Sequence, residues 1–199
     1  MILSVSRRTD IPSYFSDWFF ERLKEGHVYT KNPMNPKQIS KLQVSPDMVD
    51  CIVFWTKNPE PMLDRLKELE PYPFYFQFTL TSYGTDIEAN VPHKKEVMIP
   101  VFQRLSETIG SKRVIWRYDP IIFTRRYTPE YHIRAFRQMA EALRGCTEKC
   151  VISFVDTYAK NAKKLQDLGV YELPKEELET FAATLCTIAR ENGMVMTSC

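Results

Sequence analysis

Short apolar runs alternate with segments of helical period along the whole chain. The runs occupy positions 2–5, 51–55, 74–80, 113–118, 150–155 and 194–197. Between them, apolar residues recur every three or four positions, which predicts helices over 12–26, 61–69, 97–109, 128–145 and 173–193. Two further runs, 28–31 and 38–44, are expected to pair as a hairpin. Strand followed by helix, repeated in this way, predicts right-handed crossovers and a mostly parallel sheet.

The fold class that follows is α/β, as a partial, TIM-like (βα) barrel of about six parallel strands with outer helices. The sequence ends directly after its last apolar run, so we expect an incomplete barrel rather than a closed eightfold one. No linker or low-complexity segment divides the chain. We therefore expect a single domain over residues 1–199.

Two of the runs carry polar side chains on one face only, because successive residues of a strand point to opposite sides. Tyr75, Gln77 and Thr79 share a face, and so do Arg117 and Asp119. The opposite faces are aromatic and aliphatic, and they suit a covering layer of helices. Polar groups inside a barrel cost stability unless they are paired. A lumen of this kind therefore favours a ligand site.

The composition is that of an ordinary globular protein. Of 199 residues, 44% are hydrophobic and 26% charged, and the formal net charge is +2. This balance is too mild to indicate a nucleic-acid or membrane surface by itself. No apolar stretch has the length of a spanning helix, and no secretory signal precedes the first strand, so the cytoplasm is the expected compartment.

The cysteines and histidines show no metal or disulfide pattern. Five cysteines, an odd number, argue against a disulfide framework. Cys51 and Cys186 lie within apolar patterns and are expected to be buried thiols. His27, His93 and His132 lie near element ends or on an exposed helical turn, without the spacing of a metal site.

A cluster of polar residues follows each apolar run. In a barrel or sheet of βα units the carboxyl ends of the strands lie together at one rim of the fold, and ligands bind at that rim. The candidate ligand-binding residues are Ser6, Arg7, Arg8, Asp10, Trp55, Asn58, Gln77, Thr79 and Asp156. The candidate catalytic residues are Lys57, Arg117 and Asp119. We expect these side chains to converge.

Each candidate also has a structural interpretation. Arg7 and Arg8 could clamp an anion, since guanidinium groups match carboxylate and phosphate, or one could bridge to Asp10. Arg117 could hold an anion or pair with Asp119, which could otherwise act as a general base or orient a hydroxyl. Both interpretations remain open for these residues.

Four motifs in order resemble a known family. They are residues 5–12 (VSRRTDIP), 50–59 (DCIVFWTKNP), 75–81 (YFQFTLT) and 114–120 (VIWRYDP). They resemble the uncharacterised prokaryotic domain-of-unknown-function family eighteen forty-eight. Fuller-length members look similar and continue into a cysteine cluster like that of radical S-adenosylmethionine enzymes. The resemblance implies an iron–sulfur cluster and S-adenosylmethionine in a full-length form.

This chain ends before such a cluster, so we expect no cofactor in it as it stands. Cys199 could supply at most one ligand, whereas a cubane cluster needs three or four thiolates. The leading hypothesis is a radical-SAM-like barrel that binds a small anionic or nucleotide-like ligand at the rim. The alternatives are a non-enzymatic module, in which a second copy or partner covers the open barrel edge, and a cluster-independent barrel hydrolase or lyase. Whether the chain is an enzyme stays open.

Overall fold

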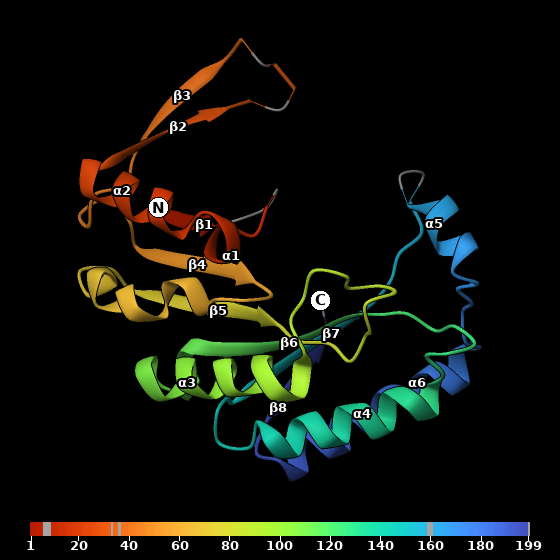
Figure 1. The fold of residues 1–199 in the computed structure, drawn as a ribbon. Helices are drawn as coiled ribbons and strands as arrows, with labels where there is room; N and C mark the ends of the chain where they lie inside the picture. Colours follow the sequence, from red (N-terminus) through yellow and green to blue (C-terminus); the bar gives the residue numbers. More distant parts are fainter. Residues whose placement is uncertain (6–8, 33, 36, 159–160, 199) are drawn as a thin grey trace. The chain divides into compact units, whose positions relative to one another are not determined.

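The protein is an α/β chain made of two compact units. The computed structural model describes residues 1–199 apart from 6–8, 33, 36, 159–160 and 199. The units are Met1–Gln77 and Phe78–Cys199, and strand β5 (Phe74–Thr79) runs from one into the other. Each unit is described by itself (Figure 1).

The first unit combines short helices with an edge of the sheet and a separate hairpin. Its elements are β1 (Ile2–Val5), α1 (Ile11–Tyr14), α2 (Ser16–Glu25), β2 (His27–Lys31), β3 (Ile39–Gln43), β4 (Cys51–Thr56) and the 3-10 helix η1 (Glu60–Leu69). Strands β1 and β4 pair in parallel, and β2 pairs with β3 in antiparallel register. The hairpin predicted for 28–44 is thus confirmed.

The second unit repeats strand and helix. Its elements are the π-helix η2 (Lys94–Met98), α3 (Ile99–Ile109), the 3-10 turn η3 (Ser111–Arg113), β6 (Val114–Ile121), α4 (Pro129–Ala142), β7 (Lys149–Phe154), α5 (Ala162–Asp167), α6 (Lys175–Glu191) and β8 (Val195–Ser198). Strand β7 pairs in parallel with both β6 and β8. Helices α4 and α6 pack side by side (Figure 1).

The strand order of the six-stranded sheet is β1-β4-β5-β6-β7-β8. The parallel α/β fold predicted from the sequence is therefore confirmed, and all six predicted strands are present. Among the described residues the order ends at β1 and β8 without closing into a barrel.

Aromatic residues form the core of the first unit. Phe54 of β4 stacks on Phe76 with ring centroids 4.7 Å apart, and Phe19 of α2 meets Phe54 edge-on at 5.3 Å. One continuous helix from Pro12 was expected, but the chain breaks at Phe15, whose φ of −138° lies outside the helical region. The break leaves Phe15 and Trp18 exposed and turns Phe19 inward.

The second unit buries one face of β6 under helices, as the alternation predicted. Trp116 is fully buried and stacks on Phe136 of α4 at 4.7 Å. Phe78 stacks on Phe102 of α3 at 4.9 Å. Arg117 alternates with Trp116 along β6, so it lies on the face of the strand away from α4.

Local expectations were met in part. The helix predicted over 61–69 is present as the 3-10 helix η1, whereas α5 had no counterpart in the prediction. Cys186 is exposed, because α6 directs its neighbour Leu185 into the core instead, whereas Cys51 is half-buried. None of the described helices is long and apolar enough to cross a membrane.

Candidate functional site

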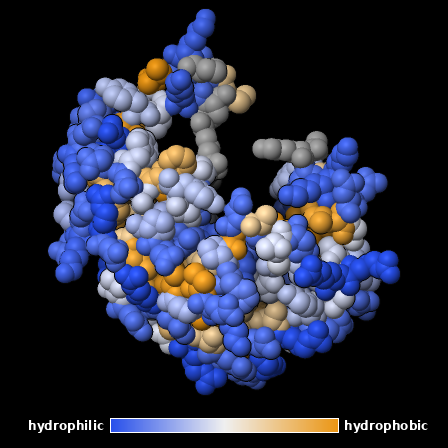
Figure 2. All heavy atoms as spheres, viewed as in Figure 1, coloured by the Kyte–Doolittle hydropathy of each residue, from blue (hydrophilic) through white to orange (hydrophobic). Residues whose placement is uncertain are grey.

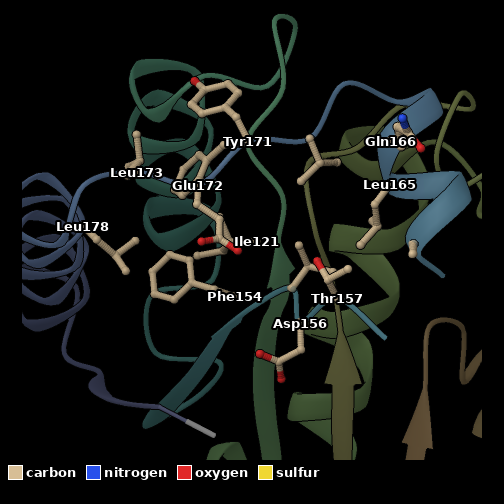
Figure 3. A pocket seen from close by; sticks show the side chains of 14 residues that line it. Ile121, Phe154, Asp156, Thr157, Leu165, Gln166, Tyr171, Glu172, Leu173 and Leu178 are labelled. Carbon is tan, nitrogen blue, oxygen red and sulfur yellow. The ribbon is translucent and has the colours of Figure 1, made fainter. Parts of the chain in front are cut away.

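A cavity of about 440 Å³ opens beyond the carboxyl ends of β6 and β7 in the second unit. Ile121 ends β6 and Phe154 ends β7, and both line it. Figure 3 shows Phe154 and Leu178 on one side and Leu165 on the other, so α6 and α5 flank the opening. Hydrophobic residues reach the surface beside α5 (Figure 2). The walls are therefore largely apolar, as in small-molecule sites.

Polar groups interrupt these walls at three places in the chain. Asp156 and Thr157 follow β7 directly, and Glu172 precedes α6; Gln166 lies on α5. Both carboxylates are solvent-exposed. Asp156 accepts a hydrogen bond from the Tyr158 hydroxyl at 3.1 Å, and this bond raises the pKa of Tyr158. Among the described lining residues, the charged ones are both acidic.

Arg117 and Asp119 of β6 form an ion pair, which is the structural one of the two interpretations left open by the sequence. The guanidinium of Arg117 donates from Nε to Oδ1 of Asp119 at 2.9 Å, and from Nη2 to Oδ2. The side chains are 8% and 13% exposed. A bidentate fork fixes both planes, and burial makes the pair sensitive to loss of either partner. Their assignment as catalytic groups stays a prediction.

The first unit brings together several predicted residues through backbone contacts. Asp10 caps α1 by accepting from the Ser13 amide at 3.0 Å, and its other oxygen accepts from the Lys57 amide at 2.7 Å. Ser13 Oγ donates to the Asn58 carbonyl at 2.8 Å. Asp10 therefore joins the start of α1 to the end of β4.

Asn58 and Trp55 also have local structural partners. Oδ1 of Asn58 accepts from the Glu60 amide at 3.1 Å, an Asx turn that opens η1. Trp55 donates from Nε1 to the Ser4 hydroxyl at 3.2 Å, which links β4 to β1. These contacts explain the residue types without a ligand, and the ligand-binding roles stay predictions.

The remaining candidates lie on β5 or outside the described residues. Gln77 is buried at the end of the first unit, and Thr79 is half-buried in the second. The structure places Arg117 with Asp119 and Asp10 with the Lys57 amide, while the Asn58 carbonyl accepts from Ser13. The predictions for Ser6, Arg7, Arg8 and Cys199 fall on residues that are not described.

A buried histidine was missed by sequence reasoning. His132 of α4 was expected on an exposed turn, but it is fully buried. Its Nε2 lies 3.2 Å from the Ile122 carbonyl and its Nδ1 lies 2.8 Å from the Tyr118 hydroxyl. Because a carbonyl only accepts, Nε2 carries the proton and Nδ1 accepts from Tyr118. Ser82 Oγ, 2.7 Å from the same hydroxyl, completes the chain.

Tyr127 holds the segment that follows β5, which carries Gly84 and Asp86. Tyr127 donates to Asp86 at 2.6 Å and accepts from the Gly84 amide at 3.0 Å. Burial, followed by the bond to Asp86, raises the pKa of Tyr127 to about 12. A Cβ at Gly84 would lie 2.9 Å from Asp86 Oδ1, so any larger residue there would have to displace the Asp86 carboxylate. The residue types gave no signal of this, since the partners are far apart in sequence.

The burial of His132 predicts a pH dependence of stability. Desolvation lowers its pKa in the folded state below the usual value of 6.5. As pH falls through that value, the unfolded chain takes up a proton that the folded chain does not, so the free energy of unfolding falls. The loss ends once pH is below the lowered folded pKa. We expect the wild type to lose more stability than His132→Gln between about pH 7 and about pH 5 in urea unfolding. Parallel pH profiles would contradict this.

The described cysteines do not fit an iron–sulfur cluster. Cys150 is fully buried and Cys186 is exposed, on β7 and α6 respectively. In the part of the chain that is described, no group of three or more His, Cys, Asp or Glu side chains could hold a metal ion. A cluster needs converging thiolates, so no chemical step is derived through one.

A parallel α/β fold with a cavity at the carboxyl ends of its strands is a scaffold that many ligand-binding and catalytic proteins share. The chain belongs to the family described as a domain of unknown function (DUF1848), whose family model matches residues 2–199. This confirms the resemblance inferred from the four motifs. A comparison with curated proteins found no match.

Proposed function

We propose that the second unit binds a small organic ligand in the cavity at the carboxyl ends of β6 and β7. The observation that carries this proposal is a hollow of about 440 Å³ with apolar walls and a few polar groups at its edge. Such hollows are typical ligand sites, and this end of a parallel sheet is where they occur. The proposal takes the sheet as part of a (βα) barrel.

The charged residues that line the cavity indicate which class of ligand would bind there. Asp156 and Glu172 are its described ionic residues, so an ammonium or another hydrogen-bond donor suits it better than an anion. The apolar body of the ligand would pack against Phe154 and Leu165. Both carboxylates remain accessible to water, and a charge-assisted bond to one of them is expected to contribute about 1–2 kcal/mol.

A matched panel of three phenyl compounds tests this proposal by isothermal titration calorimetry. We expect phenethylamine to bind and phenethyl alcohol to bind more weakly. Asp156→Asn and Glu172→Gln should each weaken the amine by about tenfold, which is about 1.4 kcal/mol. Asp167→Asn, on α5 but outside the lining, is the matched control and should bind like the wild type. The proposal fails if the amine shows no saturable binding or if all three variants bind it equally.

The second candidate is the anionic or nucleotide-like ligand predicted from the sequence. The buried fork of Arg117 on the face of β6 away from α4 favours it, since guanidinium is the preferred partner of carboxylate and phosphate. An incoming anion would have to compete with Asp119. Phenyl phosphate is the third member of the panel. Saturable binding of it that Arg117→Gln abolishes would favour this candidate over the cation.

A non-enzymatic role as a partner-binding module is the remaining proposal. Strands β1 and β8 end the strand order, and an end strand can pair with another chain. A homodimer or a partner at such a strand would raise the molecular mass in solution, whereas a ligand-binding monomer would not. Iron–sulfur chemistry would need ligands other than the described cysteines.

A further inference from the structure

The first unit contains a cavity of its own, of about 190 Å³, between β1, α2 and the β2–β3 hairpin. Its walls are mainly aliphatic and aromatic, among them Leu3, Phe19, Leu23, Leu42 and Val44. Phe19 and Val44 are at most 5% exposed, so part of this wall belongs to the core of the unit. An engineered apolar cavity of about 150 Å³ accommodates benzene, so the space suits a single ring or a short acyl chain.

One polar atom on this wall has no partner. Nε of Arg22 is buried and makes no hydrogen bond to any described residue, although Arg22 lines the cavity. The other end of the guanidinium is occupied, since Nη2 contacts Glu25 at 2.8 Å. A buried N–H without an acceptor is unfavourable, because it has lost its hydrogen bonds to water. Nearly all buried donors in folded proteins are paired, so an acceptor at this position is expected.

The remaining polar groups of the lining are also donors. Ser4 Oγ accepts from the Trp55 indole at 3.2 Å, which leaves its own proton for another acceptor. Thr30 adds a second hydroxyl. Among the described lining residues Arg22 is the charged one, and its counter-ion Glu25 is not among them. The described polar groups of the lining can therefore donate hydrogen bonds to a ligand in an apolar space.

We infer that this cavity is a binding site for a small apolar carboxylate, such as an aromatic or short-chain acid. The hydrocarbon part fills the space beside Phe19 and Leu42, and the carboxylate accepts from Nε of Arg22. The side chains of the Arg22–Glu25 pair are 31% and 44% exposed, so the pair is weak enough to rearrange around an incoming anion. The site lies in the first unit and does not depend on the proposed function of the second.

Titration of the full chain with benzoate tests the inference. We expect saturable binding by calorimetry, with benzamide and benzylamine at least tenfold weaker because they lack the charge or reverse it. Arg22→Lys keeps the charge but lacks Nε, and it should weaken benzoate by about tenfold. Val28→Phe fills the cavity from β2 and should abolish binding. Arg65→Lys, outside the lining, is the matched control and should leave the affinity unchanged.

The outcomes separate this site from the one in the second unit. Near-ultraviolet circular dichroism establishes whether each variant is folded. If only one of Arg22→Lys and Val28→Phe folds, that variant is sufficient for the test. Benzoate that does not bind, or that binds both variants like the wild type, overturns the inference. Benzamide that binds as tightly as benzoate overturns the assignment to a carboxylate. Arg22→Lys should leave the affinity for phenethylamine unchanged, so the two proposals fail independently.

Discussion

Replacing Asp119 with alanine is expected to lower the free energy of unfolding by about 3–5 kcal/mol. The substitution removes both carboxylate acceptors of the Arg117 fork from a guanidinium that is only 8% exposed. Water can reach so little of the group that solvation does not replace the lost partner. Removing one member of a buried pair costs more than the pair itself contributes.

A double variant separates the loss of the contact between Arg117 and Asp119 from the cost of keeping the buried guanidinium without Asp119. Arg117→Met with Asp119→Leu removes both ions and keeps apolar volume, so it should recover most of the stability lost in Asp119→Ala. Urea unfolding of the wild type, the single variant and the double variant measures this. A loss below about 1 kcal/mol for Asp119→Ala would contradict a buried pair and match an exposed one.

Replacing Trp116 with alanine is expected to cost about 3–5 kcal/mol as well, by a different mechanism. The indole is fully buried, stacks on Phe136 of α4 at 4.7 Å, and donates from Nε1 to the Leu80 carbonyl at 2.8 Å. Truncation leaves a cavity between β6 and α4. It also removes the hydrogen-bond donor of the Leu80 carbonyl. The stability of the second unit depends strongly on this residue.

The matched control is a tryptophan at the surface. Trp18 of α2 is 44% exposed, so Trp18→Ala should cost less than about 1–2 kcal/mol. Thermal unfolding monitored by circular dichroism compares the two variants. Similar losses for Trp116→Ala and Trp18→Ala would show that the face of β6 assigned to the helices is not buried.

Period-two alternation was sufficient to predict the layers of the sheet. In β6 the apolar face carries Trp116 toward α4, and Arg117 falls on the other face. This works because each residue's side is fixed by the strand's own geometry, whatever its distant neighbours are. Helix ends followed from similar local chemistry, as where the Thr128 hydroxyl caps α4 by accepting from the Tyr131 amide.

Features that depend on contacts between distant segments were not predictable in the same way. His132 is polar and sits on a helix, yet its environment comes from Tyr118 on β6 and from the segment that carries Ser82. No local pattern encodes those partners. The break at Phe15 was missed for a similar reason, since the Asp10 cap of α1 is tied to the Lys57 amide on a separate segment.

The candidate site was predicted in part. Asp156 was selected because it follows a strand, and it does line the cavity beyond β7. Gln166 and Glu172 also line it, but Gln166 lies on α5 and Glu172 in the segment before α6, so neither follows an apolar strand run. A short helix of six residues carries too few apolar positions to define a face.

The most direct test of the central claim is to locate the bound ligand in solution. Amide chemical shifts of the isotopically labelled chain are recorded during titration with phenethylamine. The account predicts saturable shifts concentrated at Asp156, Thr157 and Glu172, with Asp167→Asn showing the same pattern. Shifts that spread over the surface without saturation, or that spare the ends of β6 and β7, would contradict it.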